Sequence, residues 1–465
     1  MMYNLAIIGG GPAGYTAAQM AQKAGWKVVL FEGDTLGGTC LNVGCIPTKT
    51  LLYSVKQYHN AMLANKYGIS VENIAFDLKK MQQRKQKVVR KLVAGIKASL
   101  KDCTIVGAIA KVVSRTDDKV VLEAEGEQYE AEKLLICTGS NNFVPPIEGI
   151  SDNPFVLDST SALNLQEIPQ SMVIVGGGVI GMEFATLFGQ LGTKITIVEA
   201  MQDILPQLDQ DVVDLLKEKY VKQGIEILTN TKVERIDRNI VFTNNEQKPQ
   251  IEAEKILVCV GRRANLRGLE ALEDIELERG AIKVNDFMQT NLKNVYAAGD
   301  VTGKIMLAHV ASRQAEVAVG RMLKQIPLQR IAYNAIPSVV YTNPEIASVG
   351  LTEKQVSDFY KEMEGIDAYE QKGGGEAFYE VKSLPMSFSG RFVAENEGEN
   401  GLCKVIVDKR NQTILGVHAV GNPASEFIAV ASFAVRMGYT ISEFKQVVFP
   451  HPTVSEILRE TIMAI

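Results

Sequence analysis

The sequence predicts an α/β protein that contains two Rossmann-like units and ends in a separate α+β region. A strand, a glycine-rich turn, a helix and a second strand occur in this order twice along the chain. From residue 336 onward the pattern changes to short strands that alternate with helices, which is typical of an α+β domain. A length of 465 residues suggests about three domains.

The first strand–turn–helix copy begins with the apolar run at residues 5–8. Gly9, Gly11 and Gly14 follow in the spacing Gly-x-Gly-x-x-Gly, and the second strand of the copy ends in Glu32. In such units the first glycine makes the tight turn, the second admits a pyrophosphate and the third lets helix and strand pack closely. Because a helix N-terminus favours anionic phosphates, we expect a dinucleotide here, with Glu32 on its ribose hydroxyls.

The second copy repeats every part of the first. An apolar run at residues 172–175 precedes Gly176, Gly178 and Gly181, and the next strand ends in Glu199. In both copies the acidic residue lies 18 positions after the third glycine. A single glycine motif is weak support, but a motif flanked by strand, helix, strand and terminal acid is strong. The two copies therefore predict two bound dinucleotides.

A pair of thiols, Cys40 and Cys45, follows the first copy within residues 37–49. On an ideal helix their Cα atoms would lie roughly 8–9 Å apart, whereas a disulfide needs less than about 7 Å. The pair can bridge only if the turn is distorted, and Gly44 supplies the backbone freedom. Such a bridge is expected to be labile. A metal site is disfavoured because the nearest histidine is His59, and two unrelated thiols are disfavoured too.

The composition is that of an ordinary globular protein, with 46% hydrophobic and 22% charged residues. With a net charge of −5 and no basic block that stands out, nucleic acid is not expected as a partner. No apolar run reaches the roughly 18 residues of a membrane helix. The first strand starts almost at residue 1, which leaves no room for a signal peptide and favours a cytoplasmic location.

The segments between these motifs also carry structural signals. Residues 50–101 predict long helices, and residues 104–135 predict short strands separated by polar turns. Further strands are expected to end near Gly261 and Asp300. Of the other four cysteines, Cys103 is harder to place, and we expect all four to be inert filler in a chain that is no disulfide scaffold. The other three lie in apolar runs: Cys137, Cys259 and Cys403.

Taken together, these motifs resemble the disulfide-containing flavoprotein reductases over essentially the whole chain. The resemblance rests on the two glycine turns, on residues 37–49 and on the terminal run His-Pro-Thr-Val-Ser-Glu at residues 451–456. It implies a homodimer whose active site joins the cysteines of one subunit to the terminal histidine of the other. It also implies four domains: an FAD domain (1–147), an NAD domain (148–268), a central domain (269–336) and an interface domain (337–465).

The roles of the reacting residues follow from the resemblance and from their chemistry. Cys45 is expected to lie against the flavin, and Cys40 to exchange with a substrate dithiol. A base must deprotonate that dithiol, and neutral imidazole suits this role near pH 7. Of four histidines, only His451 has a polar partner at a fixed helical offset, Glu456, which would hold the ring tautomer.

The resemblance extends to residues that bind the cofactors. Lys49 and Glu183 are expected to form an ion pair beside the flavin, Asp300 to bind the ribityl chain and His309 to lie near the flavin. For FAD, the candidates are Gly9, Gly11, Gly14, Glu32, Thr39, Lys49, Thr138, Gly139, Asp300 and His309. For NAD, they are Gly176, Gly178, Gly181, Glu183, Glu199 and Gly261.

The choice of nucleotide and substrate depends on charge. No cation follows Glu199 in residues 200–203, so the site suits the free 2′-hydroxyl of NAD rather than the phosphate of NADP. This weighs against glutathione-type reductases, and no cysteine follows Cys403 to form the C-terminal pair of mercuric or large thioredoxin reductases. A flavin-binding scaffold without activity is disfavoured because every chemical group is present.

The expected reaction is therefore the NAD-dependent oxidation of protein-bound dihydrolipoamide. No lipoyl domain precedes the first unit, so we expect a separate carrier. That partner would be a lipoyl-bearing carrier or the acyltransferase core of a 2-oxo acid dehydrogenase or glycine-cleavage system.

Overall fold

The computed structural model describes residues 2–324 and 330–465, which form two compact units. The first unit comprises Met1–Pro146, Leu157–Ile168 and Val258–Ile331; the second comprises Ile147–Val156, Pro169–Leu257 and Ala332–Ile465. The expected FAD and central segments fall mainly in the first unit, and the NAD and interface segments mainly in the second. The four-domain division itself stays a prediction.

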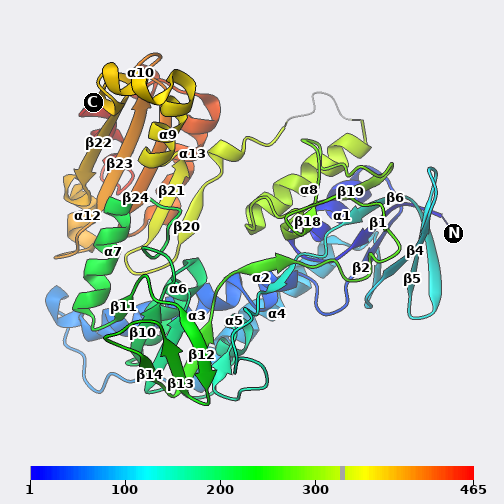
Figure 1. Ribbon diagram of the computed structural model, residues 1–465, viewed down its shortest axis with the longest axis horizontal. Helices are drawn as coiled ribbons and strands as arrows, with labels where there is room; N and C mark the ends of the chain where they lie inside the picture. Colours follow the sequence, from blue (N-terminus) through cyan, green and yellow to red (C-terminus); the bar gives the residue numbers. More distant parts are fainter. Residues whose placement is uncertain (1, 325–329) are drawn as a thin grey trace. The chain divides into compact units, whose positions relative to one another are not determined.

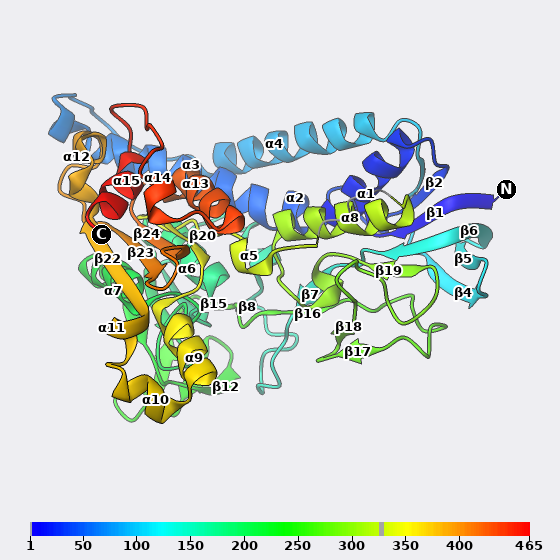
Figure 2. The ribbon, with the colours of Figure 1, turned by 90° about the horizontal axis from the view of Figure 1, so that it is seen from above.

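The first unit is built on a seven-stranded sheet in the order β3-β2-β1-β6-β5-β4, with β19 also beside β6. β1 runs parallel to β2 and β6, and Ile8 lies level with Phe31 and Ile136. The carboxyl ends of these strands therefore meet at one edge. The helices α1 (Pro12–Lys23) and α8 (Ala308–Met322) pack against each other on one face of the sheet (Figures 1 and 2). The strands are β1 (Met2–Ile8), β2 (Val28–Phe31), β3 (Thr104–Val106), β4 (Lys111–Arg115), β5 (Val120–Ala124), β6 (Glu127–Ile136) and β19 (Val295–Ala297).

A helical arm joins β2 to β3 in the first unit. It consists of α2 (Gly38–Asn42), α3 (Cys45–Met62) and α4 (Leu78–Ser99), so the long helices expected in residues 50–101 are confirmed. Between α3 and α4 the chain forms the short η1 (Ala64–Tyr67) and then leaves the helical conformation. Asp77 caps α4 by accepting a hydrogen bond from the Lys80 backbone N–H at 3.0 Å.

The second unit contains a parallel sheet that repeats the first β–α–β arrangement. β9 (Ser171–Val175) leads through α6 (Val179–Gly189) to β10 (Lys194–Val198), which pairs in parallel with both β9 and β11 (Glu226–Leu228). The sheet order is β11-β10-β9-β15-β8. The two Rossmann-like units predicted from the sequence are therefore confirmed.

The C-terminal part of the second unit is an antiparallel sheet covered by helices, as expected for an α+β region. Its order is β20-β21-β24-β23-β22, with α13 packed on β21 and β24 and α15 on β22 and β23. The strands are β20 (Ser338–Val340), β21 (Ile346–Gly350), β22 (Tyr379–Pro385), β23 (Leu402–Asp408) and β24 (Ile414–Val420). The helices are α9 (Glu353–Glu364), α10 (Ile366–Gln371), α11 (Gly375–Phe378), α12 (Gly390–Glu395), α13 (Ala424–Met437), α14 (Ile441–Phe444) and α15 (Glu456–Met463).

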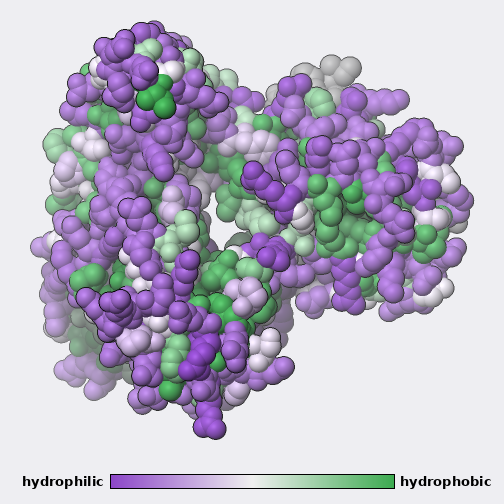
Figure 3. Space-filling model, viewed as in Figure 1, coloured by the Kyte–Doolittle hydropathy of each residue, from purple (hydrophilic) through white to green (hydrophobic). Residues whose placement is uncertain are grey.

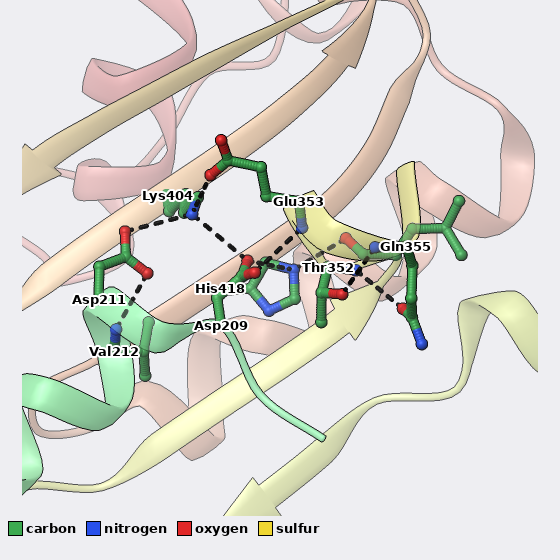
Figure 4. A network of polar contacts seen from close by, with 9 residues as sticks. Asp209, Asp211, Val212, Thr352, Glu353, Gln355, Lys404 and His418 are labelled. Atoms are coloured by element: carbon green, nitrogen blue, oxygen red, sulfur yellow. Dashed lines mark hydrogen bonds and ion pairs between the residues drawn. The ribbon is translucent and has the colours of Figure 1, made fainter. Parts of the chain in front are cut away.

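A buried ionic network connects the nucleotide-binding part of the second unit to this antiparallel sheet (Figure 4). Lys404, on β23 and only 4% exposed, lies 3.5 Å from Asp209, 3.3 Å from Asp211 and 2.7 Å from Glu353. Asp209 directly precedes α7 (Gln210–Lys222). A buried charge is tolerated only when it is paired, so the network indicates that the two parts pack in one defined way.

Shorter elements complete the two units, and their bounds are β7 (Ser140–Asn142), β8 (Val156–Leu157), α5 (Ser159–Ala162), β12 (Val233–Asp237), β13 (Ile240–Thr243), β14 (Gln250–Glu252), β15 (Lys255–Val258), β16 (Arg262–Ala264), β17 (Leu277–Glu278), β18 (Ala281–Ile282), η2 (Asp300–Thr302), η3 (Tyr333–Ala335) and η4 (Met386–Phe388). Within the described ranges, no helix is both long enough and apolar enough to cross a membrane. The face drawn in Figure 3 is mostly hydrophilic, with apolar residues in smaller patches.

Candidate active site

The two thiols lie on either side of a break between helices. α2 ends at Asn42 and α3 begins at Cys45, with Gly44 as its N-cap. A Cβ atom at Gly44 would lie 2.9 Å from the carbonyl oxygen of Thr39, which is too close for a side chain. The break brings the Cys40 and Cys45 thiols into hydrogen-bond contact. The distortion that the sequence required at this turn is therefore confirmed.

The surroundings of the thiol pair favour negative charge on one sulfur. Cys45 is the first residue of an 18-residue helix, whose N-terminus stabilises an anion. The pKa of Cys40 is raised, first by its hydrogen bond with Cys45 and then by burial, although the Lys49 ammonium lowers it. Burial, and then the neighbouring charge of the two cysteines, raises the pKa of Tyr15 as well. The raised pKa of Cys40 keeps its thiol protonated in the reduced pair.

The first glycine turn has the geometry that a dinucleotide requires. Gly9 has a φ of +102°, and a Cβ atom there would lie 2.2 Å from the Cys137 carbonyl oxygen. A Cβ atom at Gly14 would lie 1.8 Å from the Gly9 oxygen, so α1 can approach the turn only without a side chain. At Gly11, by contrast, the nearest atom is the Gly38 Cα at 3.8 Å, which leaves room in front of the helix N-terminus.

The second glycine turn repeats this construction. Gly176 has a φ of +109°, and a Cβ atom at Gly181 would lie 2.2 Å from the Gly176 oxygen. Around Gly178 no atom lies within 4 Å of such a Cβ atom. In each turn, the first glycine has a positive φ, the third is required by close packing, and the middle one faces open space. This division fits a pyrophosphate at each helix N-terminus.

Each turn is joined to the acid at the end of its second strand. Glu32 Oε2 accepts a hydrogen bond from the Gly10 N–H at 2.8 Å. In the second unit, Glu199 Oε2 accepts from the Gly177 N–H at 2.5 Å and Oε1 from the Met201 N–H at 2.7 Å. The carboxylates are thus held beside the glycine turns, where a ribose would lie.

A hydrogen-bonded chain that sequence reasoning missed holds Asp300 in the first unit. The Ser140 hydroxyl donates to Asp300 Oδ2 at 2.6 Å, and Arg262 Nε donates to the Ser140 oxygen at 2.7 Å. Burial lowers the pKa of Arg262, although the nearby Asp300 and Cys45 charges oppose this shift. Sequence reasoning could not join Ser140 to Arg262, because the two residues are far apart along the chain. The only sequence signal was that Arg262 directly follows the candidate Gly261.

The remaining candidates of the first unit are spread over its elements. Thr138 donates its hydroxyl hydrogen to the Asn265 carbonyl at 2.5 Å, and Gly139 turns the chain with a φ of +71°. Thr39 lies on α2, Lys49 on α3, His309 on α8 and Gly261 just before β16.

Glu183, the expected ion-pair partner of Lys49, belongs to the second unit. It is buried on α6, where its Oε1 accepts a hydrogen bond from the Tyr341 N–H at 3.2 Å. Because Lys49 lies in the first unit, the pair stays a prediction.

The predicted base also lies in the second unit, next to its expected carboxylate. His451 Nδ1 and Glu456 Oε1 are 3.0 Å apart, and the other carboxylate oxygen accepts from the Thr453 N–H at 2.8 Å. These two hydrogen bonds, that from Thr453 first, lower the pKa of Glu456. The His451 side chain is 80% exposed, so its second ring nitrogen can be reached from outside. The cysteines and His451 are in different units, and their meeting across a dimer stays a prediction.

Among the described residues, no group of three or more His, Cys, Asp or Glu side chains could hold a metal ion.

Two family models match the chain. Residues 3–315 match the pyridine nucleotide-disulphide oxidoreductase model, and residues 336–462 match the dimerisation domain of the same family.

Relatives match over nearly the full length. The dihydrolipoyl dehydrogenase of Mycoplasma pneumoniae is 37% identical over 99% of this chain and 98% of its own. A dihydrolipoyl dehydrogenase of Bacillus subtilis is 35% identical with the same coverage. Among solved structures, the flavoprotein disulfide reductase RclA from Escherichia coli has a TM-score of 0.85 at 30% identity, covering 100% of both chains. LpdA from Mycobacterium tuberculosis has a TM-score of 0.88 at 25% identity, covering 99% of both chains. With its thiol pair, two glycine turns and C-terminal dimerisation domain, the chain belongs to the pyridine nucleotide-disulphide oxidoreductase family.

Proposed function

We propose that this chain oxidises protein-bound dihydrolipoamide with NAD⁺, the activity for which its relatives are named. The observation that carries the proposal is the Cys40–Cys45 pair, whose thiols are in hydrogen-bond contact at the N-terminus of α3. Two thiols in hydrogen-bond contact can pass between the dithiol and disulfide states, which is the chemistry of dithiol exchange.

The residues of each unit fit one nucleotide cofactor. In the first unit, the turn at Gly9–Gly14, Glu32 and Asp300 would hold FAD, with the thiol pair on the adjoining helices. In the second unit, the open space at Gly178 and the carboxylate of Glu199 would hold NAD. When bound, FAD would supply the two-electron chemistry that links the thiol pair to hydride transfer to NAD⁺.

The chain's own residues supply the thiol chemistry. His451 accepts the proton of the incoming thiol while Glu456 stabilises the imidazolium that forms. The substrate thiolate attacks the Cys40 sulfur of the oxidised pair, and Cys45 leaves as a thiolate. The second substrate thiol, as its thiolate, then attacks the substrate sulfur that is bonded to Cys40, and Cys40 leaves as a thiolate that takes up a proton. One disulfide has formed in the substrate and one has opened in the enzyme.

A homodimer would bring the two halves of this chemistry together. The dimerisation-domain match at residues 336–462 supports this assembly. On α13, Val430, Phe433 and Met437 are exposed at helical spacing, although apolar residues normally avoid such a position. Val447 and Val448 are exposed nearby in sequence.

A lipoyl-bearing carrier, whether of a 2-oxo acid dehydrogenase or of a glycine-cleavage system, is the proposed partner, and the cytoplasm the proposed location.

Steady-state kinetics with alternative substrates test the proposal. We expect turnover of dihydrolipoamide with NAD⁺, and at most slight reduction of glutathione disulfide with NADH or NADPH. Cys45→Ser should abolish dihydrolipoamide oxidation, whereas the matched variant Cys103→Ser should retain it because Cys103 lies outside the pair. Preferred use of glutathione disulfide would assign the chain to the disulfide reductases instead.

A further inference from the structure

The charges of this chain are divided unevenly along its length. Residues 35–101 contain twelve Lys and Arg but only two acidic residues, Glu72 and Asp77. This segment therefore has ten excess positive charges in a chain whose net charge is −5, so the rest of the chain carries fifteen excess negative charges. No contiguous basic block marks the segment in the sequence, because the basic residues are interspersed with apolar and polar ones.

The helix α4 gathers most of these positive charges. Eight of its 22 residues are Lys or Arg, and none is acidic. Lys80, Arg84, Lys87 and Lys91 recur at intervals of three and four, which places them in one stripe that extends about 16 Å along the helix. The exposed basic residues of α4, here called the basic face, are Lys79, Lys80, Arg84, Lys87, Arg90, Lys91 and Lys97.

Among the residues that the structure describes, few negative charges pair with the basic face. Lys80 lies 3.7 Å from Asp77, and Arg84 donates to the Thr50 carbonyl and the Ser54 hydroxyl rather than to a carboxylate. The other five residues of the face form no ion pair with any residue that the structure describes. Like charges three and four residues apart repel each other on a helix, and a negatively charged partner would relieve that repulsion.

The basic face lies on the helices that carry the redox pair. α4 packs against α2, which contains Cys40, and against α3, which begins with Cys45 (Figure 2). The hydrogen bond from Arg84 to the Thr50 carbonyl, at 2.8 Å, joins α4 to α3 five residues after Cys45. A partner bound along α4 would therefore be held close to the thiols.

We infer that the basic face of α4 is a docking surface for the acidic surface of the carrier domain that presents the dithiol. This inference rests on the proposed function, because it names the partner of the same reaction. Nucleic acid is a poorer fit, since α4 has no aromatic side chain on which a base could stack. A membrane is also a poorer fit, because Leu92 is the only large apolar residue of α4 among the exposed ones, and peripheral helices insert an apolar face.

Charge reversal on the basic face tests the inference. The probes are free dihydrolipoamide and an isolated, reduced lipoyl domain with a net negative charge. In Lys87→Glu/Lys91→Glu, kcat/KM for the domain should fall at least about fivefold at low salt, while kcat/KM for free dihydrolipoamide stays within about twofold. Raising the salt concentration from about 20 to about 200 mM should lower kcat/KM of the wild type for the lipoyl domain. The same change should hardly alter kcat/KM of the variant for the domain.

The matched control reverses two exposed lysines of the same unit outside α4, in Lys111→Glu/Lys293→Glu. Lys111 begins β4 and Lys293 precedes β19. This variant should leave both activities unchanged. Equal kcat/KM of wild type and the α4 variant with the domain overturns the inference, as does an equal loss with both substrates. Binding of a DNA duplex or of phosphatidylserine vesicles that is lost in the α4 variant, with the domain kinetics unchanged, assigns the face to that polyanion instead. Failure of the wild type to oxidise free dihydrolipoamide would contradict the proposed function itself. This outcome differs from failure of the docking inference, in which the wild type oxidises free dihydrolipoamide normally.

Discussion

At the scale of single residues, His451 is the side chain whose replacement should separate thiol chemistry from flavin chemistry. In His451→Gln we expect dihydrolipoamide oxidation to slow by about 10²–10⁴-fold, the usual contribution of a general base. Electron transfer from NADH to an artificial dye needs no thiol deprotonation and should survive. Mixing His451→Gln and Cys40→Ser chains should restore some activity through heterodimers. Equal loss of both reactions would point to a folding or assembly defect instead.

A second prediction at this scale concerns Glu199, whose carboxylate is held beside the second glycine turn. A 2′-phosphate there would be repelled and would displace hydrogen bonds worth about 1.5–3 kcal/mol each. We therefore expect a preference for NAD over NADP of at least about tenfold in kcat/KM. Glu199→Gln with Met201→Arg should reduce that preference, whereas the corresponding first-unit change, Glu32→Gln, should not. Equal use of both nucleotides by the wild type would contradict the charge argument.

At the scale of elements, the break between α2 and α3 determines how closely the thiols approach. Gly44→Ala would place a Cβ atom 2.9 Å from the Thr39 oxygen, so the break must widen. In a glutathione redox buffer we expect a smaller disulfide fraction in this variant, measured by mass spectrometry of alkylated protein. The matched control is Gly95→Ala in α4, where no atom lies within 4 Å, and which should stabilise the helix by about 0.5–1 kcal/mol. An unchanged disulfide fraction in Gly44→Ala would show that the break does not limit bridging.

At the scale of the molecule, the network in Figure 4 makes stability depend on pH. His418 is 2% exposed and its Nε2 is 3.0 Å from the Leu351 oxygen; burial lowers its pKa, although Asp209 opposes the shift. The folded protein therefore keeps His418 neutral where the unfolded chain, with a histidine pKa of about 6.5, binds a proton. The stabilisation is present above that pKa and is lost as the pH falls through it, by up to about 1.4 kcal/mol per pH unit.

The measurement is the melting temperature of the protein between about pH 5 and pH 7.5. His418→Gln should flatten the dependence, because glutamine does not titrate. The same slope in wild type and His418→Gln would show that His418 does not set the acid sensitivity.

Sequence reasoning succeeded where the chemistry is local. Each β–α–β unit is marked by glycines whose spacing the turn requires, and the structure shows a steric reason for Gly9, Gly14 and Gly181. His451 and Glu456 are five positions apart, so their hydrogen bond was also predictable. The strands and helices expected after residue 336 did not include β21, β22 or α9. A local signal for α9 was present, because Thr352 and Gln355 form a capping box at its start.

The sequence by itself determined the two Rossmann-like units, the close thiol pair and the contact of His451 with Glu456, because each is encoded within one short segment. Only the tertiary structure decided which residues support them. Ser140 reaches Asp300 across 160 positions, and Lys404 meets Asp209 across the second unit. The packing of the basic face's helix, α4, against α2 and α3 was likewise decided only by the tertiary structure. Such contacts join residues that no local periodicity links, because folding brings distant chain segments together.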